Sequence, residues 1–218
     1  MHFLDAWSAL SLFDLVRLLA PLGFLAVGTF LPGAAVARVA ALGVAAGVPF
    51  LKELAAPPWV VAGWTALWLF VAWRAVGRRD PAPRPIRSPG GVVESGAVGI
   101  LLGLALLALL IAGVARQDMS PEDSRRASYG CMFLGLGLLH LMLRGNLRRA
   151  AIGLAALGLG LEVLDGAARA AALPGAATGG AWVLFAASLA IALVMRVAVG
   201  RERHARSARV RDAHDLHD

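Results

Sequence analysis

Long apolar segments separated by short arginine-rich connections dominate this sequence. Of its 218 residues, 59% are hydrophobic and 16% are charged, whereas soluble domains contain about 25% charged residues. A helix that crosses the hydrocarbon core of a bilayer needs about 20 apolar residues. Segments of about this length predict an all-α polytopic bundle with about seven transmembrane helices, at residues 10–31, 34–51, 59–76, 93–115, 128–143, 149–168 and 181–199.

The basic residues lie mostly at the ends of these segments, and their distribution predicts the topology. With Arg17 and Arg38 left out because they lie inside segments, the connections on one side carry 14 basic residues and those on the other carry five. Positively charged connections stay in the cytoplasm. We therefore expect a multi-pass protein of the cell inner membrane, with the N-terminus outside and the C-terminus cytoplasmic. The same distribution argues against a nucleic-acid partner, despite a net charge of +7.

Polar stretches divide the chain into four parts. Residues 78–92 are rich in proline and arginine and predict a cytoplasmic linker. This linker separates an N-terminal three-helix membrane region, residues 1–77, from a C-terminal four-helix region, residues 93–199. Residues 200–218 predict a polar cytoplasmic tail. We find no internal repeat that relates the segments to one another.

Two local patterns predict how particular helices begin and pack. Residues 117–128 are expected to form a loop, within which residues 120–123, Ser-Pro-Glu-Asp, have the pattern of a helix N-cap followed by proline. The segment at 59–76 carries four tryptophans. The outer two are expected at the membrane interfaces, and the inner two against lipid or a neighbouring helix, at positions Trp59, Trp64, Trp68 and Trp73.

Two acidic residues lie in the sixth apolar segment. Glu162, Asp165 and Arg169 are spaced at i, i+3 and i+7 and therefore share one helix face. Because an isolated charge in lipid is costly, we interpret Glu162 as a candidate proton- or ion-relay acid, held by an outer Asp165–Arg169 pair. The alternative is that both acids are solvated near the outer interface. Asp14 and Arg17 predict a further intrahelical ion pair.

His140 lies in the fifth apolar segment, where three roles fit it. These roles are a hydrogen bond to a backbone or partner group, a proton relay, and a pigment or haem ligand. No second histidine lies within the segments, so bis-histidine haem ligation is excluded. Cys131 is the only cysteine and cannot form an internal disulfide. We predict no catalytic constellation, no metal site and no cofactor.

The motif FLGLGLLHLMLRGNLRRAAIGL, residues 133–154, resembles the K subunit of respiratory complex I. In that family an apolar helix ends in a basic Arg-x-Asn-Leu turn, and the next helix opens with an apolar-Gly-apolar step. Arg144, Asn146, Leu147 and Gly153 match this outline. The complete turn, which we expect to be structural, consists of Arg144, Gly145, Asn146, Leu147, Arg148 and Arg149. The wider architecture resembles the E component of hydrogenase-4-type complexes.

The resemblance implies a non-catalytic membrane subunit of an energy-converting complex related to complex I, group 4 hydrogenases or Mrp antiporters. Such a subunit would pack beside an antiporter-like subunit and lipid, and would line or support an ion pathway faced by Glu162, Asp165 and His140. The family carries a pathway glutamate soon after the glycine of the second helix. Residues 155–157 are apolar here, so Glu162 is the nearest substitute.

Two other functions fit the sequence. One is an accessory scaffold of a photosynthetic or cytochrome complex, in which His140 and the tryptophan-rich segment would contact pigment or lipid. The other is a stand-alone protein, either a small transporter or an enzyme of lipid metabolism. A bound chlorin or haem would favour the scaffold, and stable isolation without partners would favour the stand-alone protein.

Overall fold

Every regular element in the described part of the chain is an α-helix. The computed structural model describes residues 7–30, 33–48, 57–75, 94–117, 119–142, 147–172, 185–186, 188–189, 191–193 and 196. Within these ranges the labelled helices are α2 (Leu12–Phe30), α3 (Gly33–Ala45), α5 (Pro58–Ala75), α6 (Glu94–Ala115), α7 (Pro121–Met142) and α8 (Leu147–Ala172). The all-α prediction is confirmed for these residues.

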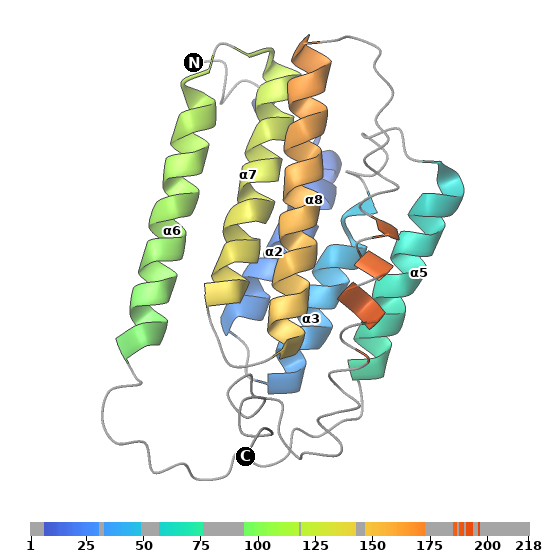
Figure 1. Ribbon diagram of the computed structural model, residues 1–218. Coiled ribbons are helices and arrows are strands. Elements are labelled where there is room, and N and C mark those ends of the chain that lie inside the picture. Colours follow the sequence, from blue (N-terminus) through green and yellow to red (C-terminus); the bar gives the residue numbers. More distant parts are fainter. Residues whose placement is uncertain are drawn as a thin grey trace.

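The helices lie side by side as a bundle, with α6, α7 and α8 in a row (Figure 1). Helices α7 and α8 form the most extensive pair, α6 packs on the other side of α7, and α2 pairs with α3. Contacts of α2 with α7 and of α3 with α8 join the two halves of the chain. Helix α5 packs against α3 at the edge of the bundle. The predicted linker at 78–92 and tail at 200–218 lie outside the described residues.

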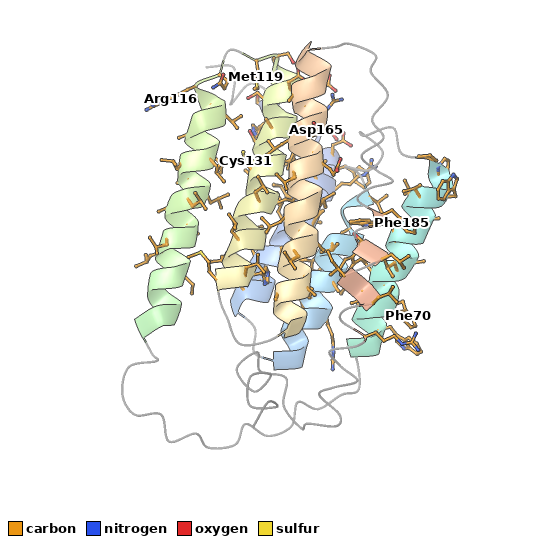
Figure 2. All side chains as sticks on the ribbon, in the orientation of Figure 1. Phe70, Arg116, Met119, Cys131, Asp165 and Phe185 are labelled. Atoms are coloured by element: carbon orange, nitrogen blue, oxygen red, sulfur yellow. The ribbon has the colours of Figure 1, made fainter. Side chains whose placement is uncertain are left out.

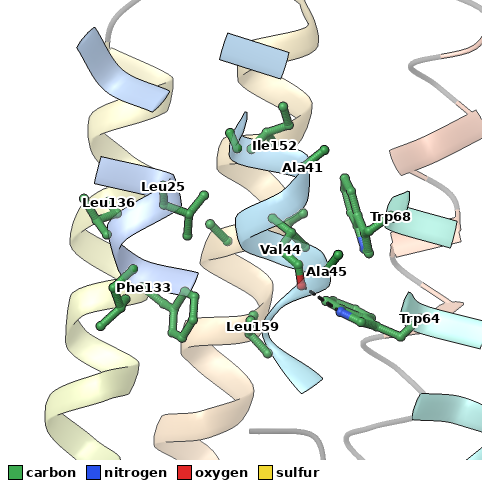
Figure 3. Packing of buried hydrophobic residues seen from close by; sticks show 14 of the residues in the cluster. Leu25, Ala41, Val44, Ala45, Trp64, Trp68, Phe133, Leu136, Ile152 and Leu159 are labelled. Carbon is green, nitrogen blue, oxygen red and sulfur yellow. Dashed lines mark hydrogen bonds between the residues drawn. The ribbon is translucent and has the colours of Figure 1, made fainter. Parts of the chain in front are cut away.

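A buried aromatic and aliphatic cluster fills the space between the two halves. Trp64 and Trp68 are fully buried in it, whereas Trp59 and Trp73 are 50% and 65% exposed at the two ends of α5. The inner pair therefore packs against a neighbouring helix rather than lipid. Figure 3 shows members of the cluster from five helices, among them Leu25, Val44, Trp64, Trp68, Phe133, Leu136, Ile152 and Leu159.

Trp64 also closes the end of a neighbouring helix. Its Nε1 donates a hydrogen bond of 2.9 Å to the backbone carbonyl of Val44 (Figure 3). Val44 lies in the last turn of α3, where the final four carbonyls lack intrahelical donors. Helix α3 ends at Ala45 rather than at the predicted residue 51. The Val44 carbonyl also accepts a hydrogen bond of 3.1 Å from the Gly47 backbone N–H, so the indole is a second donor that ties α5 to the end of α3.

Helix α7 begins earlier than the hydropathy predicts, so the expected loop over 117–128 is wrong from residue 121 onward. Ser120 is the N-cap: its hydroxyl accepts a hydrogen bond from the Asp123 backbone N–H at 3.2 Å and donates one to the Asp123 carboxylate at 2.6 Å. Arg126 bridges Glu122 at 2.6 Å one turn along. These local interactions make a helix of residues too polar to count as an apolar segment. The N-cap prediction is confirmed.

Two helices in the described residues are long and apolar enough to cross a membrane. The qualifying stretches are Leu12–Thr29 in α2 and Ala150–Ala168 in α8. Shorter apolar stretches occupy Pro58–Trp73 and Ile100–Ala115. The helical class is therefore established, with two candidate spans, and the count of seven spans stays a prediction.

Candidate functional site

The candidate site is built on the α7–α8 hairpin, whose backbones touch through two pairs of glycines. A Cβ added to Gly137 would lie 2.8 Å from the carbonyl oxygen of Gly153, and one added to Gly153 would lie 2.9 Å from that of Gly137. Gly130 and Gly160 form the second reciprocal pair, at 3.0 and 2.8 Å. Real Cβ atoms essentially never lie closer than 3.0 Å to another heavy atom, so a side chain at any of these four positions would force the two helices or the facing leucine to shift.

A leucine of the opposite helix fills the space beside each of these glycines. Leu134 lies against Gly160, and Leu141 against Gly153. The partners from α8 follow the same rule, with Leu157 against Gly137 and Leu164 against Gly130. The pattern Gly-x3-Leu-x2-Gly-x3-Leu therefore occurs twice, at 130–141 and 153–164, and packs against itself with approximate two-fold symmetry.

This repeat corrects the expectation that the chain contains none. Its signal is present in the sequence as two glycines seven residues apart in each helix. A seven-residue spacing keeps side chains on one face of a helix that coils gently around its partner. The repeat differs from the Gly-x3-Gly motif, which describes a different crossing geometry.

The hairpin holds Glu162 and Asp165 on the side of α8 away from these glycines. Glu162 is half-buried and Asp165 is exposed. The midpoint of the Ala150–Ala168 stretch is residue 159, so Glu162 lies about 4–5 Å and Asp165 about 9 Å from it at about 1.5 Å per residue. Asp165 lies at the same end of the bundle as Arg116 and Met119 (Figure 2). The Arg169 side chain lies outside the described residues.

His140 is fully enclosed and bonds to another helix. Its Nε2 lies 3.0 Å from the backbone carbonyl oxygen of Leu25 in α2, and the side chain is 1% exposed. A Cβ on Gly28 would lie 3.4 Å from the His140 ring, so the glycine allows the ring to approach α2 closely. Of the three predicted roles, the structure shows the interhelical hydrogen bond, which requires Nε2 to carry the proton.

The structure separates His140 from the two acids. The glycine pairs place residue 150 of α8 level with His140, because Gly137 faces Gly153 and Gly130 faces Gly160. Glu162 is twelve residues further along α8, or about 18 Å at about 1.5 Å per residue. Glu162 and His140 therefore do not share one site, and a direct proton transfer between them is excluded by distance.

The predicted basic turn lies largely outside the described residues. Arg144 and Asn146 precede the start of α8 at Leu147 and are not described. Arg148 and Arg149 belong to the first turn of α8, and their side chains are not described.

Within the described ranges, no group of three or more potential ligands from His, Cys, Asp and Glu could hold a metal ion. Cys131 is a buried free thiol beside Val114 and Ala167. The candidate site therefore consists of Glu162 and Asp165, and its features are the depth of these acids in the apolar stretch of α8 and the side of α8 that carries them.

In comparisons with known proteins, no family model matches the chain, and neither the curated proteins nor the solved structures contain a match.

Proposed function

We propose that the chain is a multi-pass protein of the cell inner membrane, with about seven spans, its N-terminus outside and its C-terminus cytoplasmic. Large exposed apolar side chains support this placement, because soluble monomers rarely expose continuous apolar surfaces of this kind. One face of helix α6 packs against α7, where Leu139 of α7 fits against Gly103 and Leu107 of α6 fits against Gly135. Elsewhere on α6 the leucines at 101, 102, 104 and 109 are exposed.

The exposed tryptophans of α5 also support a membrane position. Trp59 and Trp73 are fourteen residues apart, or about 21 Å along the helix axis. Tryptophan is enriched at the two membrane interfaces. One exposed indole at each end of an apolar helix is the pattern expected of a span, while Trp64 and Trp68 between them anchor that span to α3.

Within this membrane placement, the function supported best is that of a subunit of an energy-converting complex, lining or supporting an ion or proton pathway. The observation that carries the proposal is Glu162: a half-buried carboxylate about 4–5 Å from the midpoint of an apolar stretch. Ionisable residues at such depth usually mark ion or proton paths. The resemblance of residues 133–154 to the K subunit of complex I points to the same class, with an antiporter-like subunit as neighbour.

The replacement Glu162→Gln tests this function in the intact complex from native membranes. Glutamine keeps the size and hydrogen bonding of the side chain but cannot carry a proton or a charge. We expect most of the ion-coupled activity to be lost while the subunits still purify together. The matched control Glu122→Gln, at the exposed start of α7, should leave coupling unchanged.

Two results would count against the proposal. Unchanged coupling in Glu162→Gln would remove this acid from the pathway. Purification of the tagged chain from native membranes without any redox or antiporter-like subunit would overturn membership in such a complex.

A further inference from the structure

Helices α2 and α7 begin with the same structure. Ser11 caps α2 and Ser120 caps α7, and each hydroxyl accepts a hydrogen bond of 3.2 Å from the N–H of an aspartate and donates one of 2.6 Å to its carboxylate. Asp14 thus bonds to Ser11, and its predicted ion pair with Arg17 does not form among the described residues. Six residue types recur where numbers differ by 109, as from 11 to 120: Ser11, Asp14, Arg17, Phe24, Leu25 and Gly28 match Ser120, Asp123, Arg126, Phe133, Leu134 and Gly137.

The contacts between consecutive helices repeat in the same register. A Cβ on Gly160 of α8 would meet the Gly130 carbonyl oxygen at 2.8 Å and the backbone nitrogen four residues further along α7 at 2.8 Å. A Cβ on Gly43 of α3 would meet the Pro21 carbonyl oxygen at 2.9 Å and the backbone nitrogen four residues further along α2 at 3.1 Å. Numbers again differ by 109 between α2 and α7, and they differ by 117 between α3 and α8. The same differences relate the contact of Gly28 with Ala40 to that of Gly137 with Leu157.

The third helix of each half also matches. Residues 59–78 and 182–201 have identical residues at seven positions when their numbers differ by 123, as from Trp59 to Trp182. The described residues between 185 and 196 are helical, as α5 is. The identical positions in the first stretch are Trp59, Val60, Val71, Ala75, Val76, Gly77 and Arg78.

The chain therefore contains two three-helix repeats. The first repeat is α2, α3 and α5, and the second repeat is α7, α8 and the helical residues between 185 and 196. The repeats have one orientation, because α2 runs parallel to α7: Trp7 lies beside Tyr129, with ring centroids 4.9 Å apart, and Leu25 lies beside His140. Three helices leave the chain on the opposite side from its start, so α6 is needed to return it before the second repeat begins.

Each helix meets its own counterpart where the repeats join, a boundary that we call the seam. Helix α2 packs against α7, and α3 packs against α8. In the third pair, a Cβ on Gly63 of α5 would lie 3.1 Å from the Phe185 ring. Contact between equivalent helices is the arrangement produced by an approximate two-fold axis that runs along the helices.

The packing inside a repeat differs from the packing at the seam. Inside each repeat, glycines bring helix backbones into contact, as at Gly43 and Gly160. At the seam, side chains make the contacts: the His140 ring reaches the Leu25 carbonyl at 3.0 Å, and Leu159 packs on Gly47. Side chains packed across an interface allow helices to slide or part more readily than backbones in direct contact. The repeats are therefore the rigid units, and the seam is the joint.

We propose that the chain is a fused pair of equivalent three-helix repeats that move against each other as rigid units, with the seam held closed by the hydrogen bond from His140 to the Leu25 carbonyl. Opening the seam gives access to the buried cluster between the two halves. Repeats related by an axis along the membrane normal are used in this way by transporters, in which one repeat rocks against the other. The inference does not depend on Glu162 or on the kind of complex.

Spin labels at four exposed positions test the repeat in the full chain, with Cys131→Ala, reconstituted into bilayers. Phe13 of α2 and Phe70 of α5 are equivalent to Glu122 and Leu193 in the second repeat. Pulsed electron–electron double resonance should give equal mean distances for the pair Phe13→Cys and Phe70→Cys and for the pair Glu122→Cys and Leu193→Cys. Mean distances that differ by more than one helical turn, about 5 Å, would overturn the repeat.

The pair Phe70→Cys and Glu122→Cys crosses the seam and reports its opening. His140→Phe keeps a ring but cannot donate to Leu25, so it should add a second distance population for this pair while both pairs within repeats keep one. His140→Gln, whose amide can donate to the same carbonyl, should retain the single population. Trp64→Phe breaks a bond inside the first repeat, and this matched control should leave the cross-seam distance unchanged.

Phe185→Ala, which removes the side chain packed on Gly63, loosens the seam at a second point and gives a reading if His140→Phe inserts poorly. A second cross-seam population in either variant, with constant distances within the repeats, supports the proposal. A single unchanged population in both variants would overturn the moving seam, and so would equal broadening of the distances within the repeats. These results are independent of the Glu162→Gln coupling experiment, so either idea can fail alone.

Discussion

Gly137→Ala is the sharpest test of the α7–α8 contact. The new Cβ would lie 2.8 Å from the Gly153 carbonyl oxygen and 2.8 Å from the Leu157 backbone nitrogen. Ordinary contacts begin at 3.4 Å, so the helices must separate locally by about 0.6 Å. Overpacking destabilises the folded state by about 1–3 kcal/mol, and the better helix propensity of alanine stabilises it by up to about 1 kcal/mol. We expect a net loss of about 1–2 kcal/mol in the free energy of unfolding.

The control is Gly113→Ala in α6, where a Cβ would meet nothing within 4 Å. The free energy of unfolding of this variant should be unchanged or higher by up to about 1 kcal/mol. Gly153→Ala should destabilise the protein as Gly137→Ala does. The double variant should lose less unfolding free energy than the two single variants together, because one separation of the helices accommodates both methyl groups.

Reversible unfolding in mixed micelles, followed by tryptophan fluorescence, measures all four variants. Equal stability of Gly137→Ala and the parent protein would refute the close backbone contact. A loss in Gly113→Ala as large as in Gly137→Ala would show that glycine acts through general helix flexibility instead.

Three further replacements test single interactions by the same unfolding measurement. His140→Ala should lose about 2–4 kcal/mol, because it removes a buried ring and its bond to the Leu25 carbonyl; a loss below about 1 kcal/mol would mean that the bond is unimportant. Trp64→Phe should lower the free energy of unfolding by about 2 kcal/mol, because it removes the bond to the Val44 carbonyl and leaves a cavity where the larger indole was fully buried; unchanged stability would argue against close packing around this indole. Ser120→Ala should lose about 1 kcal/mol through the N-cap, and no loss would place the start of α7 elsewhere.

The centres of the described helices were predictable from the sequence because each lies in a long apolar stretch bounded by polar or arginine-rich residues. Their ends were not. Residues 121–128 are polar, yet the Ser120 cap and the Arg126–Glu122 bridge make them helical. Hydropathy measures suitability for lipid, whereas helix ends depend on capping groups.

The candidate site was predictable only in part. The spacing of Glu162 and Asp165 predicts that they lie on one side of α8. Only the structure shows that Glu162 is half-buried and Asp165 exposed. The His140 bond joins residues 115 positions apart, so no local pattern could reveal it. The glycine repeat was readable, but its meaning depends on an antiparallel partner that the sequence does not identify.

The central claim is that α8 crosses the membrane with Glu162 near its middle. A nitroxide on Leu161→Cys, one residue away and 58% exposed, measures this directly in Cys131→Ala protein reconstituted into bilayers. Power saturation should show strong relaxation by oxygen and little by a water-soluble nickel chelate, with the reverse at Arg116→Cys at the end of α6. Strong relaxation by the nickel chelate at position 161 would contradict the account, because it would place this stretch of α8 in water.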